Sequence, residues 1–250
     1  MSGNARRIQL EPAFLLHHYP WRDSSRILEL LTQSQGRVSV FARAARRRGS
    51  PLAPAFQPFS ELLVTFSLRS DAGLLTAVER TAVIAPTLPR ARLMAGFYAN
   101  ELLIRLLPRG DPHPRLFAAY AALVEELTQP AADPSRALRI FEKRLLEELG
   151  YGLNLVTEVS SGRSVDAQQS YRYRVDSGPE PVRGVAEGSL IFCGRSLLAL
   201  ATETLDDARS VADARRLLRA ALDQVLDGRE LRTRQVALAM RALARDADTG

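Results

Sequence analysis

The feature of this 250-residue chain that most constrains its fold is a change in the spacing of its apolar residues. Between residues 60 and 69, apolar side chains occupy every second position from Leu62 to Leu68. Side chains of a strand alternate between two faces, so this spacing predicts a strand with one face in a core. Beyond Pro86 and Pro89 the apolar residues recur at intervals of three and four, as in helices. The chain is therefore predicted to begin with strands and to continue with helices.

The first part is predicted to contain five strands. They cover residues 8–19, 24–33, 36–43, 60–69 and 74–84, and turn-forming residues separate them at 20–23 and 70–73. No long helix is predicted between them, and a small closed barrel is an arrangement that removes exposed sheet edges. We therefore expect a five-stranded barrel of the oligonucleotide-binding (OB) fold, which holds single strands on the face of its second and third strands.

The third predicted strand and the loop after it carry the candidate nucleic-acid surface. One side of this strand is apolar and suits a core: Val38, Val40 and Ala42. The other side carries two guanidinium groups flanking an aromatic ring, and an arginine run follows: Arg37, Phe41, Arg43, Arg46, Arg47 and Arg48. Cations beside an aromatic ring suit a phosphate backbone with stackable bases. The alternative is a solvated edge strand whose arginines only prevent pairing with other chains.

The positive charge of the chain is concentrated in this first part. The whole chain has a net charge of +6, and residues 1–82 carry 11 arginines against 6 acidic residues, a net of +5. The remaining residues carry 22 arginines, one lysine and 22 acidic residues, a net of +1. A basic module joined to a nearly neutral one indicates that the basic module contacts a polyanion.

The second part is predicted to be helical with one interruption. Helices are expected over residues 90–107, 114–127, 134–149, 208–226 and 230–245. Asp133 before Pro134 is typical of a helix start, and Gly150 of a helix end. Residues 152–207 have the composition of loops, with one short strand over 171–175 that forms a solvent-facing hairpin or stacks its tyrosines on bases. We thus predict an α+β protein of two domains, residues 1–83 and 84–250, the second being a helical bundle with an irregular insert at 152–207.

The third predicted helix carries a basic stripe beside its core stripe. The basic residues recur at intervals of three and four: Arg136, Arg139 and Lys143. One interpretation is a solvated face whose cations pair with Glu142, Glu147 or Glu148. The other is a docking surface for an acidic peptide next to an apolar groove.

Several classes of function are disfavoured by what the sequence lacks. Its single cysteine, Cys193, excludes an internal disulfide and a multi-cysteine zinc site. His17 and His18 point to opposite faces of a strand, so with His113 they are expected to be structural rather than metal ligands. We find no glycine-rich phosphate loop, no nucleophile elbow and no clustered acidic motif, so binding is favoured over catalysis and no cofactor is expected. A further alternative is an OB-containing nuclease or ligase accessory enzyme.

The sequence also indicates where the protein acts. It contains no run of about 18 apolar residues and no apolar centre of a signal peptide near its start. We therefore expect a cytoplasmic protein.

Several segments of the chain combine a distinctive sequence with a distinctive order and spacing. They are Ser25-Arg26-Ile27-Leu28, Gly36-Arg37-Val38, Ala42-Arg43-Ala44-Ala45-Arg46-Arg47, Phe56-Gln57-Pro58-Phe59, Leu116-Phe117-Ala118-Ala119-Tyr120 and residues 139–151. In this order and spacing they resemble the bacterial RecO family of recombination mediators and DNA repair proteins. They extend over residues 6–153, and a late segment at 232–234 takes the resemblance nearly to the end of the chain. Many family members carry a four-cysteine zinc site in the insert, where this chain has only Cys193. It therefore resembles the metal-free branch of the family, with a degenerate zinc-finger region.

The resemblance implies a function without a catalytic step. It implies binding of single- and double-stranded DNA, annealing of complementary strands and help in loading RecA onto single strands coated by single-stranded-DNA-binding protein. It implies partnership with RecR and with the acidic tail of that coating protein, and association with the nucleoid. The positions it assigns to DNA contact are Arg26, Arg37, Phe41, Arg43, Arg46, Arg47 and Arg48. It places the groove for the acidic tail on the helical domain, where we expect Arg136, Arg139 and Lys143 beside an apolar rim that includes Leu146. The alternative is a protein-docking scaffold whose DNA contact is secondary.

Overall fold

The computed structural model describes residues 6–22, 25–43, 50, 52, 56–69, 72–81, 88–182 and 190–248. Its contacts divide the chain into two compact units. The first unit combines Met1–Pro130 with Glu230–Gly250, and the second is Ala131–Arg229. Within the described ranges, no helix has both the length and the apolar character needed to cross a membrane.

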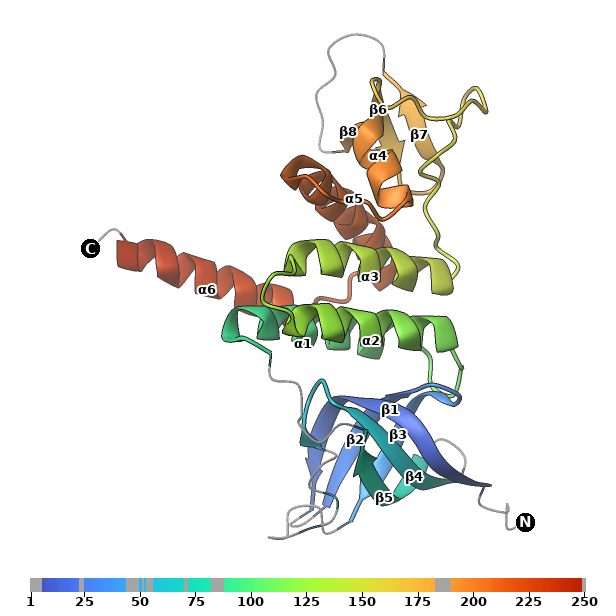
Figure 1. The fold of residues 1–250 in the computed structure, drawn as a ribbon, viewed down its shortest axis with the longest axis vertical. Coiled ribbons are helices and arrows are strands. Elements are labelled where there is room, and N and C mark those ends of the chain that lie inside the picture. The colour runs from blue at the N-terminus through green and yellow to red at the C-terminus, as the bar shows by residue number, and fades with distance from the viewer. Residues whose placement is uncertain are drawn as a thin grey trace. The chain divides into compact units, whose positions relative to one another are not determined.

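The first unit contains a closed five-stranded barrel (Figure 1). Its strands are β1 (Arg6–Trp21), β2 (Ser25–Thr32), β3 (Gly36–Ala42), β4 (Glu61–Arg69) and β5 (Ala72–Arg80). They pair in the order β1-β2-β3-β5-β4, and β1 closes the barrel against β4. Only β3 and β5 run parallel; the other pairs are antiparallel. The predicted fold class, an OB-type barrel followed by helices, is confirmed.

The barrel interior follows the alternation of the sequence. Leu62, Val64 and Phe66 of β4 are fully buried, as the spacing in that strand predicts. In β3 the residues predicted to face the core are buried in the same cluster: Val38, Val40 and Ala42. Burying an aliphatic side chain of this size contributes about 1.5 to 3 kcal/mol, so the alternation largely determines which face of each strand turns inward.

Two helices of the same unit, α1 (Arg90–Leu106) and α2 (Pro114–Thr128), pack on the outside of β1 (Figure 1). The Phe14 ring lies 5.3 Å from the ring of Phe117 and 5.0 Å from that of Tyr120, both on α2. The side-chain amide of Asn100 on α1 donates to the Leu16 carbonyl at 3.0 Å. One end of the outer surface of β1 is therefore covered by helices.

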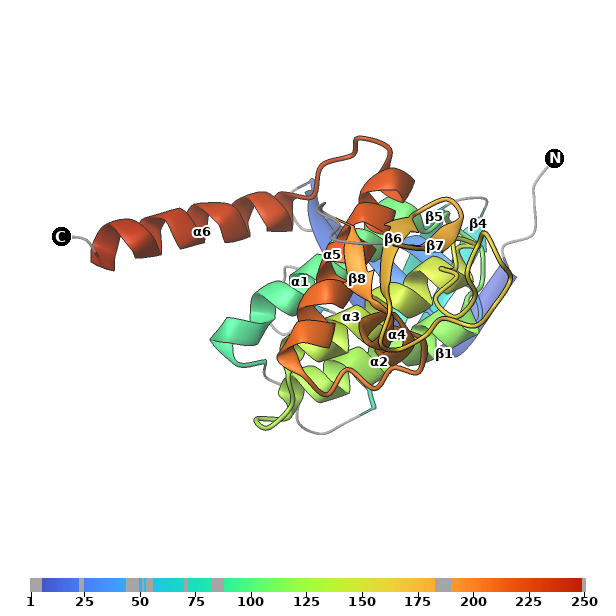
Figure 2. The same ribbon diagram turned by 90° about the horizontal axis from the view of Figure 1, so that it is seen from above.

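The last helix, α6 (Arg232–Asp248), returns to the first unit and begins against α1. The Glu101 carboxylate accepts the backbone N–H groups of Arg232 and Thr233 at 2.8 and 2.9 Å. It thereby satisfies two of the unpaired donors at the start of α6. From that point α6 extends away from α1 (Figures 1 and 2).

The second unit is built on α3 (Pro134–Glu148) and α5 (Ala208–Leu226), which pack against each other. The Asp133 carboxylate accepts the N–H of Ser135 at 2.8 Å, so the predicted helix start is confirmed. Asp207 caps α5 in the same way, through the N–H of Ser210. Gly150 has a φ of +81° directly after α3, as a helix-terminating glycine requires.

The insert is more regular than the sequence predicted. It contains a sheet in the order β7-β6-β8, formed by β6 (Ser170–Arg174), β7 (Gly178–Pro181) and β8 (Ile191–Cys193), followed by α4 (Gly194–Ala201). The predicted short strand is present as β6, which pairs antiparallel with β7 and exposes Arg172 and Arg174. The alternative that its tyrosines stack on bases is wrong, because Tyr171 and Tyr173 are buried. The Tyr171 hydroxyl donates to Glu158 at 3.0 Å and accepts the N–H of Asp166 at 2.8 Å. A small aromatic core with internal hydrogen bonds thus holds the insert together.

Candidate nucleic-acid interface

The outer surface of β1, β2 and β3 divides into a covered part and an open part. Strand register aligns two rows of outward side chains: Phe14, Leu31 and Arg37, and Tyr19, Ile27 and Phe41. Rings of α2 cover the first row at Phe14, which is buried. In the second row Tyr19 is 42% exposed. A ligand of the barrel surface therefore has access to the second row.

Arg37 lies in the covered part and is occupied by a buried carboxylate. Its guanidinium donates to Glu29 at 2.7 Å and to the Leu107 carbonyl at 3.0 Å. Glu29 also accepts from Arg109 at 2.5 Å and from the Ser39 hydroxyl. The side chains of Arg37 and Glu29 are only 13% and 3% exposed.

The prediction that two exposed guanidinium groups flank Phe41 is therefore wrong for one of them. Arg37 shares the outward side of β3 with Phe41, but the loop after α1 encloses it. Sequence alternation assigns a side chain to a face and does not show that a distant segment covers part of that face. Arg43, directly after β3, is exposed.

Arg26 lies at one end of the barrel interior. In the register it is opposite Ala42, which belongs to the core. Its guanidinium lies 2.7 Å from Nδ1 of His18 and 5.1 Å from the centre of the Phe56 ring. Burial lowers the pKa of His18, and the nearby Arg26 cation lowers that pKa further, so the imidazole is neutral and can accept the hydrogen bond. Arg26 has a structural role in this geometry.

The open part retains the other predicted positions of the barrel. Phe41 is half-buried and Arg43 is exposed. The predicted contacts Arg46, Arg47 and Arg48 lie outside the described residues.

Two aromatic residues of the open part were missed by sequence reasoning. Trp21 is 45% exposed, and its ring lies 5.8 Å from that of Phe41. Tyr19 is in the same row as Phe41, across β2. The sequence placed Pro20 and Trp21 in a turn, whereas β1 continues through Trp21. If the predicted strand is extended by two residues, its alternation places Trp21 on the outward face beside Tyr19.

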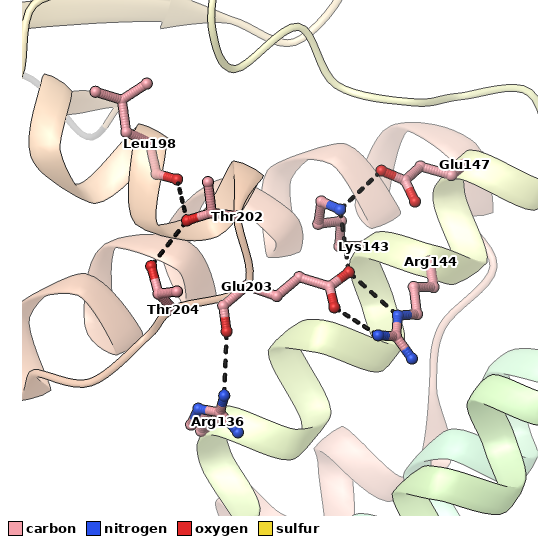
Figure 3. A network of polar contacts seen from close by, with 8 residues as sticks. All are labelled: Arg136, Lys143, Arg144, Glu147, Leu198, Thr202, Glu203 and Thr204. Atoms are coloured by element: carbon pink, nitrogen blue, oxygen red, sulfur yellow. Dashed lines mark hydrogen bonds and ion pairs between the residues drawn. The ribbon is translucent and has the colours of Figure 1, made fainter.

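In the second unit, two residues of the basic stripe of α3, Arg136 and Lys143, contact Glu203 together with Arg144 (Figure 3). The Glu203 carboxylate accepts from Lys143 at 3.1 Å and from Arg144 at 3.1 and 2.5 Å. Arg136 donates to the backbone carbonyl of Glu203 at 3.1 Å. Lys143 also forms an ion pair with Glu147 at 3.0 Å. These cations bind carboxylate and carbonyl oxygens of their own chain.

Two further residues assigned to the acidic-tail site are buried. Arg139 is 7% exposed and pairs with Glu142 at 2.8 Å. Leu146 is fully buried. The expectation that Leu146 forms an exposed apolar rim is therefore wrong in this geometry, because that side of α3 packs into the core of the unit. The interpretation of the stripe as cations paired with nearby glutamates fits the contacts of Arg139 and Lys143.

The Glu203 network predicts acid sensitivity of the second unit. Burial alone raises the pKa of Glu203, but the hydrogen bonds from Arg144 and Lys143 outweigh it and hold the pKa below its usual value of 4.5. A lowered pKa stabilises the folded state above about pH 4.5, and this stabilisation is lost as the pH falls through the folded-state pKa. We expect Glu203→Gln to cost about 1 to 2 kcal/mol at pH 7, after allowance for the partial exposure of Arg144.

Urea denaturation of wild type and Glu203→Gln at several pH values measures this effect. The difference in unfolding free energy should shrink steadily below pH 4.5. Glu147→Gln is the matched control, because Glu147 is 45% exposed and its removal should cost under about 0.5 kcal/mol. A difference that is the same at pH 3.5 and pH 7 would show that the carboxylate charge does not stabilise the network.

No group of three or more histidine, cysteine, aspartate or glutamate side chains suited to a metal ion occurs among the described residues. Cys193 is half-buried, and its thiol donates to the Ala167 carbonyl at 3.1 Å.

Comparison with known proteins identifies the family of this chain. The family model described as recombination protein O N terminal matches residues 8–84, and the one described as recombination protein O C terminal matches residues 90–235. The chain belongs to the RecO family. The first RecO match covers the barrel, and the second begins at α1. The resemblance inferred from the sequence is thereby confirmed.

Curated RecO relatives cover almost the whole chain. The protein named DNA repair protein RecO from Methylococcus capsulatus is 40% identical over 94% of this chain and 95% of its own length. The one from Alkalilimnicola ehrlichii is 42% identical over 94% and 92%, and the one from Coxiella burnetii is 41% identical over 92% and 98%. Membership of the RecO family gives the chain a role in DNA repair and recombination.

Proposed function

We propose that this chain is a DNA-binding recombination mediator. It binds single- and double-stranded DNA, anneals complementary strands and helps to load RecA onto strands coated by single-stranded-DNA-binding protein. It performs no chemical step and needs no cofactor. The observation that carries the proposal is an OB-type barrel, in a chain of the RecO family, that bears nearly all of the net positive charge.

The charge of the barrel supports a phosphate contact. Both carboxylates of β1, β2 and β3 are buried: Glu29 is bound by Arg37 and Arg109, and Glu11 accepts the N–H and the hydroxyl of Ser34. The exposed cation Arg43 and the adjacent arginine run then face a DNA strand without competing carboxylates on these strands. Each phosphate contact releases condensed counterions, which favours binding at low salt.

The same charge supports annealing. Two complementary strands repel each other through their phosphates, and this repulsion slows their encounter. Arginines that neutralise phosphates on both strands reduce the repulsion, so base pairing proceeds without a further catalytic group. We assign the phosphate contacts to Arg43, Arg46, Arg47 and Arg48, and leave Arg26 and Arg37 as structural residues.

We further propose RecR and the acidic tail of single-stranded-DNA-binding protein as partners, and a nucleoid-associated location in the cytoplasm. A tail carboxylate that binds Arg136 or Lys143 has to displace oxygens of Glu203. Charge reversal at Arg139 or Lys143 would therefore perturb the second unit itself, and it is not a clean test of docking.

The docking scaffold is the second candidate function. One observation favours it: α6 exposes large apolar side chains at Val236, Leu238 and Met240. If DNA contact is secondary, the scaffold keeps its partners when the arginine run is removed. Its annealing rate then does not depend on that run either.

The annealing rate of two complementary oligonucleotides separates the two candidates. Replacement of Arg46, Arg47 and Arg48 by alanine should lower the protein-dependent rate by at least about tenfold at low salt, since about three phosphate contacts are lost. Triple replacement of Arg172, Arg174 and Arg209, which lie on exposed positions of the second unit, is the charge-matched control and should leave the rate within about twofold. Equal rates for all three proteins would refute annealing by the barrel.

A further inference from the structure

We infer that the open part of the barrel surface stacks on the unpaired bases of single-stranded DNA. The inference rests on the proposed function and deepens it, because it assigns base contact to residues distinct from the phosphate contacts. The site consists of Tyr19, Trp21 and Phe41, which we call the aromatic face.

The geometry of the aromatic face suits flat ligands. Tyr19 and Phe41 flank Ile27 in one row across β1, β2 and β3. Trp21 lies diagonally across β2 from Phe41, with ring centres 5.8 Å apart and ring planes at 67°. His17 packs edge-on against Tyr19, with ring centres 4.5 Å apart. The rings of β1 and β3 thus lie on one outward face of the three strands, with Ile27 of β2 between Tyr19 and Phe41.

The exposure of these rings is not explained by the fold. Phe14, further along β1, is covered by the rings of α2 and is buried. Tyr19 and Trp21 remain 42% and 45% exposed. Clustered exposed aromatic rings on a folded protein mark an interaction site, since they lose the free energy of burial without a ligand.

The charged residues next to the aromatic face indicate which ligand it binds. Arg22 and Arg43 adjoin Trp21 and Phe41 in the sequence, are exposed, and form no ion pair within the described residues. Glu29, two residues from Ile27, is buried beneath Arg37 and Arg109. Flat rings bordered by unpaired cations match a ligand with flat rings and negative charge, which is an unpaired nucleotide. A duplex keeps its bases stacked inside and offers only its backbone.

Tryptophan fluorescence reports directly on the aromatic face, because Trp21 is the only tryptophan of the chain. We expect the fluorescence of the full-length protein to be quenched in step with binding of an oligo-dT strand at low salt. A duplex of the same length should bind with less quenching, since its bases are not free to stack. Single-strand binding that leaves the Trp21 emission unchanged would overturn the inference and leave the proposed function intact.

A pair of variants separates stacking from phosphate contact. The double variant Tyr19→Ala with Trp21→Ala should lower the single-strand affinity by about fivefold or more, because about fivefold is the smallest loss expected when one stacked base is lost. Its duplex affinity should stay within about twofold of that of the wild type. The plot of log affinity against log salt should shift down without a change of slope, because no phosphate contact is lost. Trp21→Phe with Tyr19→Phe should restore most of the affinity.

Tyr151→Ala is the matched control, since Tyr151 is an exposed aromatic residue of the second unit, and it should leave single-strand affinity unchanged. Circular dichroism shows whether each variant is folded. An unaltered single-strand affinity in the folded double-alanine variant refutes base stacking. Wild-type protein that binds neither strand form would instead refute the proposed function.

Discussion

Replacement of Gly36 by alanine is expected to destabilise the first unit by about 2 to 5 kcal/mol. Gly36 has a φ of +67°, and a Cβ added there would lie 2.0 Å from the backbone oxygen of Asp111. The left-handed conformation costs an alanine about 1 to 2 kcal/mol, and the overlap forces two backbone segments apart at a further cost of about 1 to 3 kcal/mol. Urea denaturation followed by circular dichroism measures the loss.

Gly110→Ala is the matched control for this prediction. Gly110 has a φ of +73°, but nothing lies within 4 Å of the position of its Cβ. This variant should therefore show only the conformational cost of about 1 to 2 kcal/mol. If both variants lose the same free energy, the close approach of the β2–β3 turn to the loop before α2 does not contribute to stability.

Replacement of Arg37 by leucine is expected to cost about 3 kcal/mol. It leaves the buried Glu29 carboxylate with Arg109, which is half-exposed, and with the Ser39 hydroxyl. Removing one partner of a buried ion pair is strongly destabilising, because the remaining charge stays out of water. Arg43→Leu removes an exposed arginine that follows the same strand and should change stability by less than about 0.5 kcal/mol.

A double-mutant cycle attributes the effect of Arg37→Leu to the carboxylate. Glu29→Leu combined with Arg37→Leu should be less destabilised than the sum of the two single variants, because the double variant leaves neither charge of that pair behind. Additive losses would mean that Arg37 acts through its hydrogen bond to the Leu107 carbonyl instead. Either way, a stability loss as large as that predicted would confirm that Arg37 is part of the fold and not of an open DNA surface.

Much of the fold could be predicted because it depends on local patterns. Alternation in β3 and β4 identifies the buried residues of the barrel, and Asp133 and Asp207 mark helix starts through their own side chains. Of the short strands of the insert, alternation predicted the one at 171–175, which is β6, but not β7 or β8. Three or four residues are too few for a period to emerge. What fixes Tyr171 inside is a hydrogen bond to Glu158, thirteen residues away.

The candidate site was harder to predict than the fold because it depends on which surfaces distant segments cover. Arg37 and Arg43 fall on the same side in the alternation that runs through β3, and the loop after α1 covers the first and leaves the second exposed. The basic residues of α3 could be listed from the sequence, but Glu203, which binds Lys143, is sixty residues away. Trp21 was not identified as a site residue, because the end of the 16-residue strand β1 was predicted to be a turn.

The central claim is that arginines of the barrel grip a phosphate backbone. The most direct test is the single-strand affinity of the full-length protein, measured by fluorescence anisotropy from 50 to about 300 mM salt, for wild type and for the triple alanine variant at Arg46, Arg47 and Arg48. We predict a straight line of log affinity against log salt whose slope becomes shallower by about two units in the variant, since each lost contact to a single strand removes about 0.7. Identical slopes for the two proteins, or a wild-type affinity that does not depend on salt, would contradict it.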